Sequence, residues 1–262
     1  MKTLQVLRYS IINGFQDAAA MFTPKTYLTG WLLRVLSQVT FFALIGSLLG
    51  SEETTHFLLV GNVVAVGAMV VHSVSASTVW ERWAGTLPLL FAAPSRPLIV
   101  LMGRSFNWVP DAMFSATGAL LIVGPIFGLP MPWPEVLWVL PLLLATIIAT
   151  YGFGLFLGSM SIRAPESRNF ISRVATTVTM AICGVNVPVD FFPGAVQAVA
   201  YSLPVTHGLL AIRSVLDVSS ASVVLAHLSA ALLTGAGWYA VAIISFSLFE
   251  ARSRTTGSLE FG

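Results

Sequence analysis

Polar side chains at helical spacing inside two apolar stretches are the residues of this chain whose types could do chemistry. The first stripe consists of Arg104, Asn107, Asp111, Ser115 and Gly118. The second consists of Ser172, Thr176, Thr179, Cys183 and Asn186. Steps of three and four place each set on one helical face, and such a face must lie against protein or water because lipid offers no hydrogen-bond partners. The stripes either line a route for a cargo or join helices, and joining is the commoner role of hydroxyl groups.

Ionisable side chains in these stretches need a partner, because a charge at the bilayer centre costs about 2.5 to 3.5 kcal/mol on insertion scales. Arg34 and Asp111 lie deepest in apolar sequence, and Arg104 precedes Asp111 on the same stripe. We therefore predict an intramembrane ion pair in which Arg34 or Arg104 neutralises Asp111.

No catalytic or metal-binding constellation accompanies these residues. The histidines at 72, 207 and 227 are dispersed, and Cys183 is the single cysteine. The chain has no His-Glu-x-x-His, no Gly-x-Ser-x-Gly and no phosphate-binding loop with a lysine after glycine. A lone histidine without a second ligand at metal-binding spacing is usually a hydrogen-bonded structural residue. We expect no active site, no metal, no cofactor and no ATP site in this chain.

The composition indicates what kind of secondary structure positions these polar residues. Charged residues make up 9% of the chain and apolar residues 56%, whereas a soluble domain carries about 25% charged residues. The fold class expected is an all-α membrane protein, since each helical crossing needs roughly 20 apolar residues. Windows of that length predict six spans at 27–49, 56–79, 98–127, 135–160, 170–189 and 222–249. A net charge of +2 without a long basic run argues against a nucleic-acid partner.

The distribution of lysine and arginine predicts the orientation of these spans. One set of connections holds Lys2, Arg8, Lys25, Arg82, Arg96, Arg104, Arg163, Arg168, Arg173, Arg252 and Arg254. The opposite connections hold Glu52, Glu53, Glu135, Asp190 and Asp217, with Arg213 as their one cation. The positive-inside rule therefore places the first set and both termini in the cytoplasm.

Flanking segments complete a single transmembrane domain over residues 1–262. Leu4, Leu7, Ile11 and Phe15 recur at helical steps, which predicts an amphipathic interfacial helix within 1–26; a mobile basic tail is the alternative. The six-span bundle covers 27–249, and 250–262 forms a polar cytoplasmic tail.

Two connections are too apolar or too specific in pattern for ordinary loops. Residues 190–221 are apolar but interrupted by prolines, which predicts two short re-entrant helices that dip into the outer leaflet and pack against other spans. Residues 80–97, between spans two and three, predict a short helix that Pro94 and Pro97 terminate. A dozen helical residues extend about 18 Å, too short to cross a bilayer. Resting on lipid headgroups is the alternative role of this helix.

At these two connections the chain resembles the type-2 ABC transporter permease family. After the second span, the resemblance rests on Glu81, Arg82, Gly85, Thr86, Leu87, Leu90 and Pro94. Before the sixth span, it rests on Pro188, Phe192, Pro193, Leu203, Pro204, Thr206, His207 and Arg213. The layout is similar over nearly the whole chain, and the departure is Pro88, where family members often carry an acidic residue.

The resemblance implies a permease subunit of an ATP-driven exporter in a prokaryotic inner membrane. It implies that 81–94 is a coupling helix on a separate ATP-binding subunit, present in two copies, which carries the ATP and Mg. A second permease, identical or homologous, would complete the transporter. A route between spans two and five would then have these candidate lining residues: Asn62, His72, Ser73, Thr176, Thr179 and Asn186. An outer gate would comprise Pro188, Phe191, Phe192 and Pro193. Drugs, antibiotics, lipids and glycolipids are the expected cargo classes, with multidrug or antibiotic resistance as one possible role.

Two other classes remain open from the residues alone. An ATP-independent secondary transporter or channel would need a midplane carboxylate or broken spans in matching halves; Asp111 is the available carboxylate, and no two-fold repeat is visible. An intramembrane enzyme would use Asp111, His72 or His207, which show no recognisable catalytic spacing.

Overall fold

The computed structural model describes residues 3–21, 23–75, 77, 85–86, 89–90 and 96–256, and these residues form helices without a strand. Four helical stretches among them are long and apolar enough to cross a membrane: Pro24–Leu48, Pro97–Ile126, Glu135–Arg163 and Ala221–Arg252. A fifth candidate is a bent helix pair at 194–216. The all-α class and the multi-pass architecture are therefore confirmed, whereas the full six-span layout stays a prediction.

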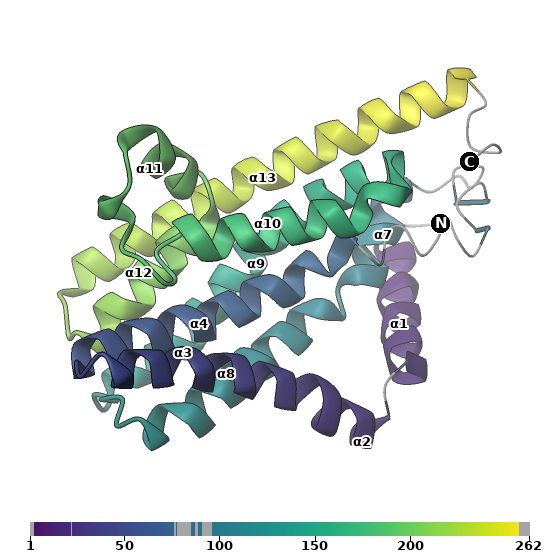
Figure 1. The fold of residues 1–262 in the computed structure, drawn as a ribbon. Helices are drawn as coiled ribbons and strands as arrows, with labels where there is room; N and C mark the ends of the chain where they lie inside the picture. The colour runs from purple at the N-terminus through teal and green to yellow at the C-terminus, as the bar shows by residue number, and fades with distance from the viewer. Residues whose placement is uncertain are drawn as a thin grey trace.

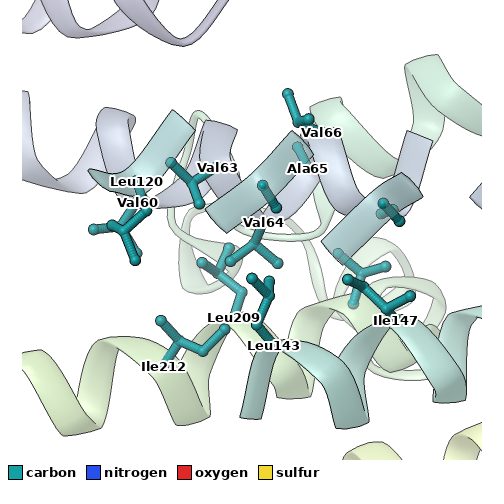
Figure 2. Close-up of a cluster of buried hydrophobic side chains, with 14 of the residues drawn as sticks. Val60, Val63, Val64, Ala65, Val66, Leu120, Leu143, Ile147, Leu209 and Ile212 are labelled. Atoms are coloured by element: carbon teal, nitrogen blue, oxygen red, sulfur yellow. The ribbon is translucent and has the colours of Figure 1, made fainter. Parts of the chain in front are cut away.

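Helix α4 (Glu52–His72) lies at the centre of the bundle. It packs against α3 (Leu33–Leu48), α8 (Trp108–Ile126), α9 (Val139–Arg163), α10 (Arg168–Ile182) and α12 (Pro204–Leu216). Figure 2 shows Val60, Val63 and Val64 of α4 among buried side chains of the surrounding helices, including Leu120, Leu143 and Leu209. Residues 58–68 are buried without interruption, as expected of a helix surrounded by other helices.

Small residues bring α9, α12 and α13 (Ala221–Thr256) into close contact. Helix α9 carries small residues at four-residue steps, Thr146, Thr150, Gly154 and Gly158, and all four are buried. A Cβ on Gly208 of α12 would overlap the Thr146 side chain, and one on Gly235 of α13 would meet Ala149 at 2.7 Å. These helices approach closely because their contact positions lack bulk.

The third predicted span contains a break that hydropathy does not reveal. Helix α7 (Pro97–Ser105) ends before Phe106 and Asn107, and α8 begins at Trp108. Pro110 has no amide hydrogen to donate to Phe106 four residues earlier, so the helical hydrogen bonding is interrupted there. The Phe106 carbonyl instead accepts from Val109 at 3.0 Å. The predicted polar stripe on this span is therefore divided between two helices.

The fifth predicted span, 170–189, is helical only as far as Ile182. The short helix η3 (Pro165–Ser167) precedes α10, and η4 (Val189–Phe191) follows it. Gly184 has a φ of +82°, a left-handed conformation that favours glycine. Cys183 and Asn186 thus lie on irregular backbone and not on the helical face predicted for them. We call residues 183–186 the post-α10 segment.

A pair of short helices occupies the next connection, as its prolines predict. Helix α11 (Gly194–Tyr201) and α12 are bent by 85° relative to each other. Figure 1 shows α11 and α12 at the end of the bundle opposite α1. Their entry into the outer leaflet stays a prediction.

Helix α1 (Thr3–Met21) occupies the N-terminal segment and packs against α7, and its position at a membrane surface stays a prediction. Gly103 of α7 lies against Ser10, and Gly14 lies against the Arg104 backbone. After α1, the helices α2 (Pro24–Thr26), η1 (Tyr27–Leu32) and α3 form one continuous candidate span, with η1 a π-helix. Figure 1 shows α1, α7 and the last turns of α13 at one end of the bundle, which we call the α1 end.

The last helix is longer than predicted. Helix α13 has 36 residues and continues to Thr256, seven residues past the predicted end of the sixth span at 249. At 1.5 Å per residue it is about 54 Å long, which exceeds the roughly 30 Å hydrocarbon core. The first part of the predicted polar tail is therefore helical, and residues 257–262 lie outside the described residues.

Candidate functional site

Two candidate route residues from distant parts of the sequence meet in the bundle. The Asn62 side-chain amide of α4 donates to the Asn186 Oδ1 of the post-α10 segment at 3.0 Å and to the Leu58 carbonyl at 2.9 Å. Asn62 is 0% exposed, and its Oδ1 has no partner among the described residues. The Asn186 amide reaches the Met180 carbonyl at 3.4 Å. The structure thus has α4 and the post-α10 segment in contact at the position where the predicted route would pass.

Arg213 of α12 joins the same two segments. One guanidinium nitrogen donates to the Gly184 carbonyl at 2.9 Å, and another donates to the Phe57 carbonyl of α4 at 2.9 Å. The guanidinium carbon lies 3.6 Å from the centroid of the Phe57 ring, where a cation is attracted by the aromatic face. Arg213 therefore satisfies the carbonyl of Gly184, a residue just past the end of α10 where no helical partner is available.

The backbones of these segments approach closely beside Arg213. A Cβ on Gly61 of α4 would lie 2.9 Å from the Val185 carbonyl carbon and 3.1 Å from a guanidinium nitrogen of Arg213. Cys183 beside Gly184 is 1% exposed, and Val185 is 0% exposed. Cys183 and Val185 of the post-α10 segment are therefore closed to solvent in this structure.

The other candidate route residues are His72 at the end of α4, Ser73 directly after it, and Thr176 and Thr179 of α10. Thr179 is buried, whereas Ser73 and Thr176 are half-buried. The His72 side chain lies outside the described residues. Their role in a route stays a prediction.

The four predicted gate residues precede α11. Phe191 is 79% exposed and packs edge-on against Phe192, with ring centroids 5.8 Å apart. The Phe192 carbonyl accepts from the Gln197 side chain at 2.8 Å. Pro188 and Pro193 are exposed. In this single chain Phe191 is exposed and Phe192 is half-buried, and their gating role stays a prediction.

The predicted intramembrane ion pair has different partners. Arg104 forms a salt bridge with Asp17 of α1 at 2.5 Å, the one salt bridge between two described residues. Asp111 accepts a hydrogen bond from the Tyr27 hydroxyl at 2.6 Å. Arg34 lies over the Trp31 ring at 4.7 Å, close enough to Asp111 for an electrostatic interaction but without a salt bridge. The pairing of Arg104 with Asp111 was wrong because the break before α8 and the fold of α1 bring Asp17 nearer.

The predicted coupling residues fall largely outside the described structure. Those outside it are Glu81, Arg82, Leu87 and Pro94. Of the others, Gly85 has a φ of +68°, and a Cβ there would meet nothing within 4 Å. The Leu90 amide donates to the Thr86 carbonyl at 3.0 Å, which is the spacing of one helical turn.

Leu90 connects this segment to a small apolar cluster on three helices. The cluster has Leu101 of α7, Ile162 of α9 and Phe246 of α13 buried at its centre, and Leu90, Leu98 and Phe249 pack against it. We call these six residues the Phe246 cluster. Its neighbour Leu89 is 71% exposed. The segment is thus anchored to the bundle at one residue and free to contact another molecule at the next.

The contact made by Arg213 was not foreseen from the residues alone. The available signal was its position as the single cation among acidic connections on one side of the predicted bundle. His207 meets the expectation for a structural histidine, because its Nε2 lies 2.9 Å from the Tyr201 carbonyl. No metal-binding cluster occurs in the part of the chain that the structure describes.

These features define a class: an all-helical multi-pass membrane protein with a polar contact between its central helix and a broken helix. The family model of the ABC-2 type transporter matches residues 22–216, more than half of the chain. The chain therefore belongs to the ABC-2 type transporter family, and is a permease component of an ABC transporter that works with an ABC ATP-binding subunit. No curated protein matches the chain.

Proposed function

We propose that this chain is the permease of an ATP-driven exporter for an amphipathic substrate such as a drug, antibiotic, lipid or glycolipid. The family match over residues 22–216 carries this proposal. We assign the α1 end of the bundle to the cytoplasm, because arginines and lysines are concentrated in the connections predicted on that side. Two permeases, identical or homologous, and two ATP-binding subunits form the working transporter of a prokaryotic inner membrane.

We propose that residues 81–94 receive the movement of the ATP-binding subunit. The packing of Leu90 in the Phe246 cluster supports this role, because that cluster joins the segment to α7, α9 and α13 at once. A displacement of the segment would then move three helices together, since packed side chains transmit strain.

We propose that the route for the substrate opens where α4 meets α10 and the post-α10 segment. Polar groups support this assignment: the Asn62–Asn186 hydrogen bond joins α4 to the post-α10 segment, and Thr179 of α10 is also buried. Separating one such interhelical hydrogen bond costs about 0.6 kcal/mol on average and up to about 1.7. That cost is small beside the free energy that a partner ATPase supplies, so the contact can open and close during transport.

A photo-crosslinking amino acid at position 89 tests the docking site of the ATP-binding subunit. Leu89 is exposed and adjacent to the anchored Leu90. Leu225, an exposed residue at the start of α13, is the matched control position. We expect the ABC ATP-binding subunit to be captured in cells from position 89 and not from position 225. Equal capture from both positions, or from neither, contradicts docking on this segment.

Replacement of Glu81 or Gly85 tests coupling itself. We expect Glu81→Ala and Gly85→Ala to insert into the membrane at the wild-type level but to lose ATP-dependent export. Unchanged export in both variants would remove the coupling role of the segment.

A further inference from the structure

We propose that Arg213 is a releasable latch that holds α4 and the post-α10 segment together and exchanges its partners for Asp217 when the contact opens. This inference rests on the proposed function, because opening is useful only in a transport route. The latch residue lies on α12, so three segments that are distant in sequence are held by one side chain.

In the closed arrangement the planar guanidinium bridges two segments. Two of its nitrogens donate to carbonyls on different segments, at Phe57 and Gly184, both at 2.9 Å. The fork of an arginine fits such two-point recognition, whereas a lysine offers a single point charge. The third nitrogen, Nε, is buried and has no hydrogen-bond partner among the described residues. In the closed arrangement the Nε donor is therefore unsatisfied. Less hydrogen-bonding free energy is lost when Arg213 moves away than if all its nitrogens were bonded.

An alternative partner for the guanidinium lies one turn further along the same helix. Asp217 follows Arg213 by four residues and is exposed at the end of α12. The Asp217 carboxylate lies near enough to favour the charged guanidinium, without a salt bridge between these two described residues, and residues at this spacing lie on the same helical face. A hollow of about 200 Å³ adjoins both, lined also by Glu53, His56 and Phe57. Arg213 thus has room and a carboxylate to move to without leaving its helix.

The irregular backbone explains why a latch is needed here. The helix α10 ends at Ile182, and carbonyls at membrane depth must be satisfied or reach water. When Arg213 withdraws, the Gly184 carbonyl must find water, so release of the latch and hydration of this contact are one event. Two discrete arrangements of one side chain are the kind of element that ligands or partners can bias.

Cys183 is a built-in reporter of that event. It is the single cysteine of the chain, it precedes Gly184, and it is 1% exposed. A water-soluble maleimide will label it at a rate proportional to the open population. The measurement uses the permease in lipid nanodiscs together with its ATP-binding subunit, so that both faces are accessible to the reagent.

Without nucleotide, we expect slow labelling of the wild type and about tenfold faster labelling of Arg213→Gln. A tenfold change corresponds to about 1.4 kcal/mol. Arg213→Lys should give an intermediate rate. The matched control is Arg163→Gln, because Arg163 also donates to a backbone carbonyl, that of Ser245, but near the α1 end. An unchanged rate in Arg213→Gln, or an equal rise in Arg163→Gln, overturns the latch.

General loosening of the bundle is distinguished by a second reporter. Ser105 is 0% exposed and hydrogen-bonded to Tyr151 away from the latch. In a Cys183→Ser, Ser105→Cys chain, we expect Arg213→Gln to leave position 105 unlabelled. Labelling there would make Arg213 a general structural brace, which contradicts the latch.

Exchange with Asp217 is tested during ATP hydrolysis. We expect ATP to accelerate Cys183 labelling in the wild type, and Asp217→Asn to reduce that acceleration severalfold while the nucleotide-free rate stays unchanged. An acceleration that Asp217→Asn leaves intact overturns the exchange. If ATP accelerates no labelling while the nucleotide-free results hold, the proposed ATP-driven function fails and the resting latch stands.

Discussion

Because α4 lies so close to the post-α10 segment, adding a single methyl group at this contact should lower the free energy of unfolding. We consider Gly61→Ala, with Gly67→Ala on the same helix as the matched control. A Cβ at position 61 would lie 2.9 Å from the Val185 carbonyl carbon, whereas one at position 67 would meet Ile147 side-chain atoms at 3.4 Å. Carbon atoms rest at about 3.5 to 4.0 Å from one another, so only Gly61→Ala forces backbone apart.

The magnitude follows from two opposing terms. Replacing glycine by alanine inside a helix gains about 1 kcal/mol, and this gain applies at both positions. Overpacking costs typically about 1 to 3 kcal/mol, and applies at position 61 alone because the obstructing atoms belong to backbone. The free energy of unfolding should therefore differ between the two variants by about 1 to 3 kcal/mol.

Thermal unfolding of the purified protein, followed by tryptophan fluorescence in one detergent, measures this difference. For chains of this length, 1 kcal/mol shifts Tm by about 2 to 4 °C. Gly61→Ala should thus unfold about 2 to 12 °C below Gly67→Ala. Equal Tm values for the two variants would refute the close contact on which the route and the latch depend.

Three further outcomes follow from other contacts. Gly85→Ala places a Cβ at a left-handed φ, which costs about 1 to 2 kcal/mol per residue, so ATP-driven transport should fall while Gly85→Asn, which tolerates this φ better, retains more of it. Phe246→Ala leaves a cavity in the Phe246 cluster, so it should destabilise the chain by about 3 to 5 kcal/mol in a thermal unfolding assay. Asp17→Asn removes an ion pair with Arg104 that is partly exposed. The free energy of unfolding should therefore fall by no more than about 1 kcal/mol, measured from the shift in Tm, and by less in high salt.

Hydropathy predicted where the helices lie but not where their hydrogen bonding stops. The first span was expected at 27–49, and the continuous helix covers Pro24–Leu48. The breaks at Phe106 and after Ile182 were missed, because the residues on both sides remain apolar and a window average does not register one proline or one left-handed glycine. These breaks redirect Arg104, Cys183 and Asn186, so the polar stripes were only partly correct.

The site residues were found by type, whereas their partners are tertiary. Asn62 and Asn186 were separate candidates for a route, and nothing in their spacing of 124 residues indicates that they share a hydrogen bond. The pairing of Arg104 with Asp111 failed for the same reason: Arg104 pairs with Asp17, and Asp111 accepts a hydrogen bond from Tyr27 of η1. Polarity in an apolar stretch predicts that a partner exists, but only the packing selects which one.

The central claim is that this permease transports its substrate only when an ABC ATP-binding subunit acts on it. Uptake of fluorescent amphipathic compounds into inside-out proteoliposomes tests it most directly, with the chain reconstituted alone or with the ATP-binding subunit that co-purifies in mild detergent. We predict uphill uptake that requires both that subunit and ATP. Uphill uptake by the chain alone would contradict the account.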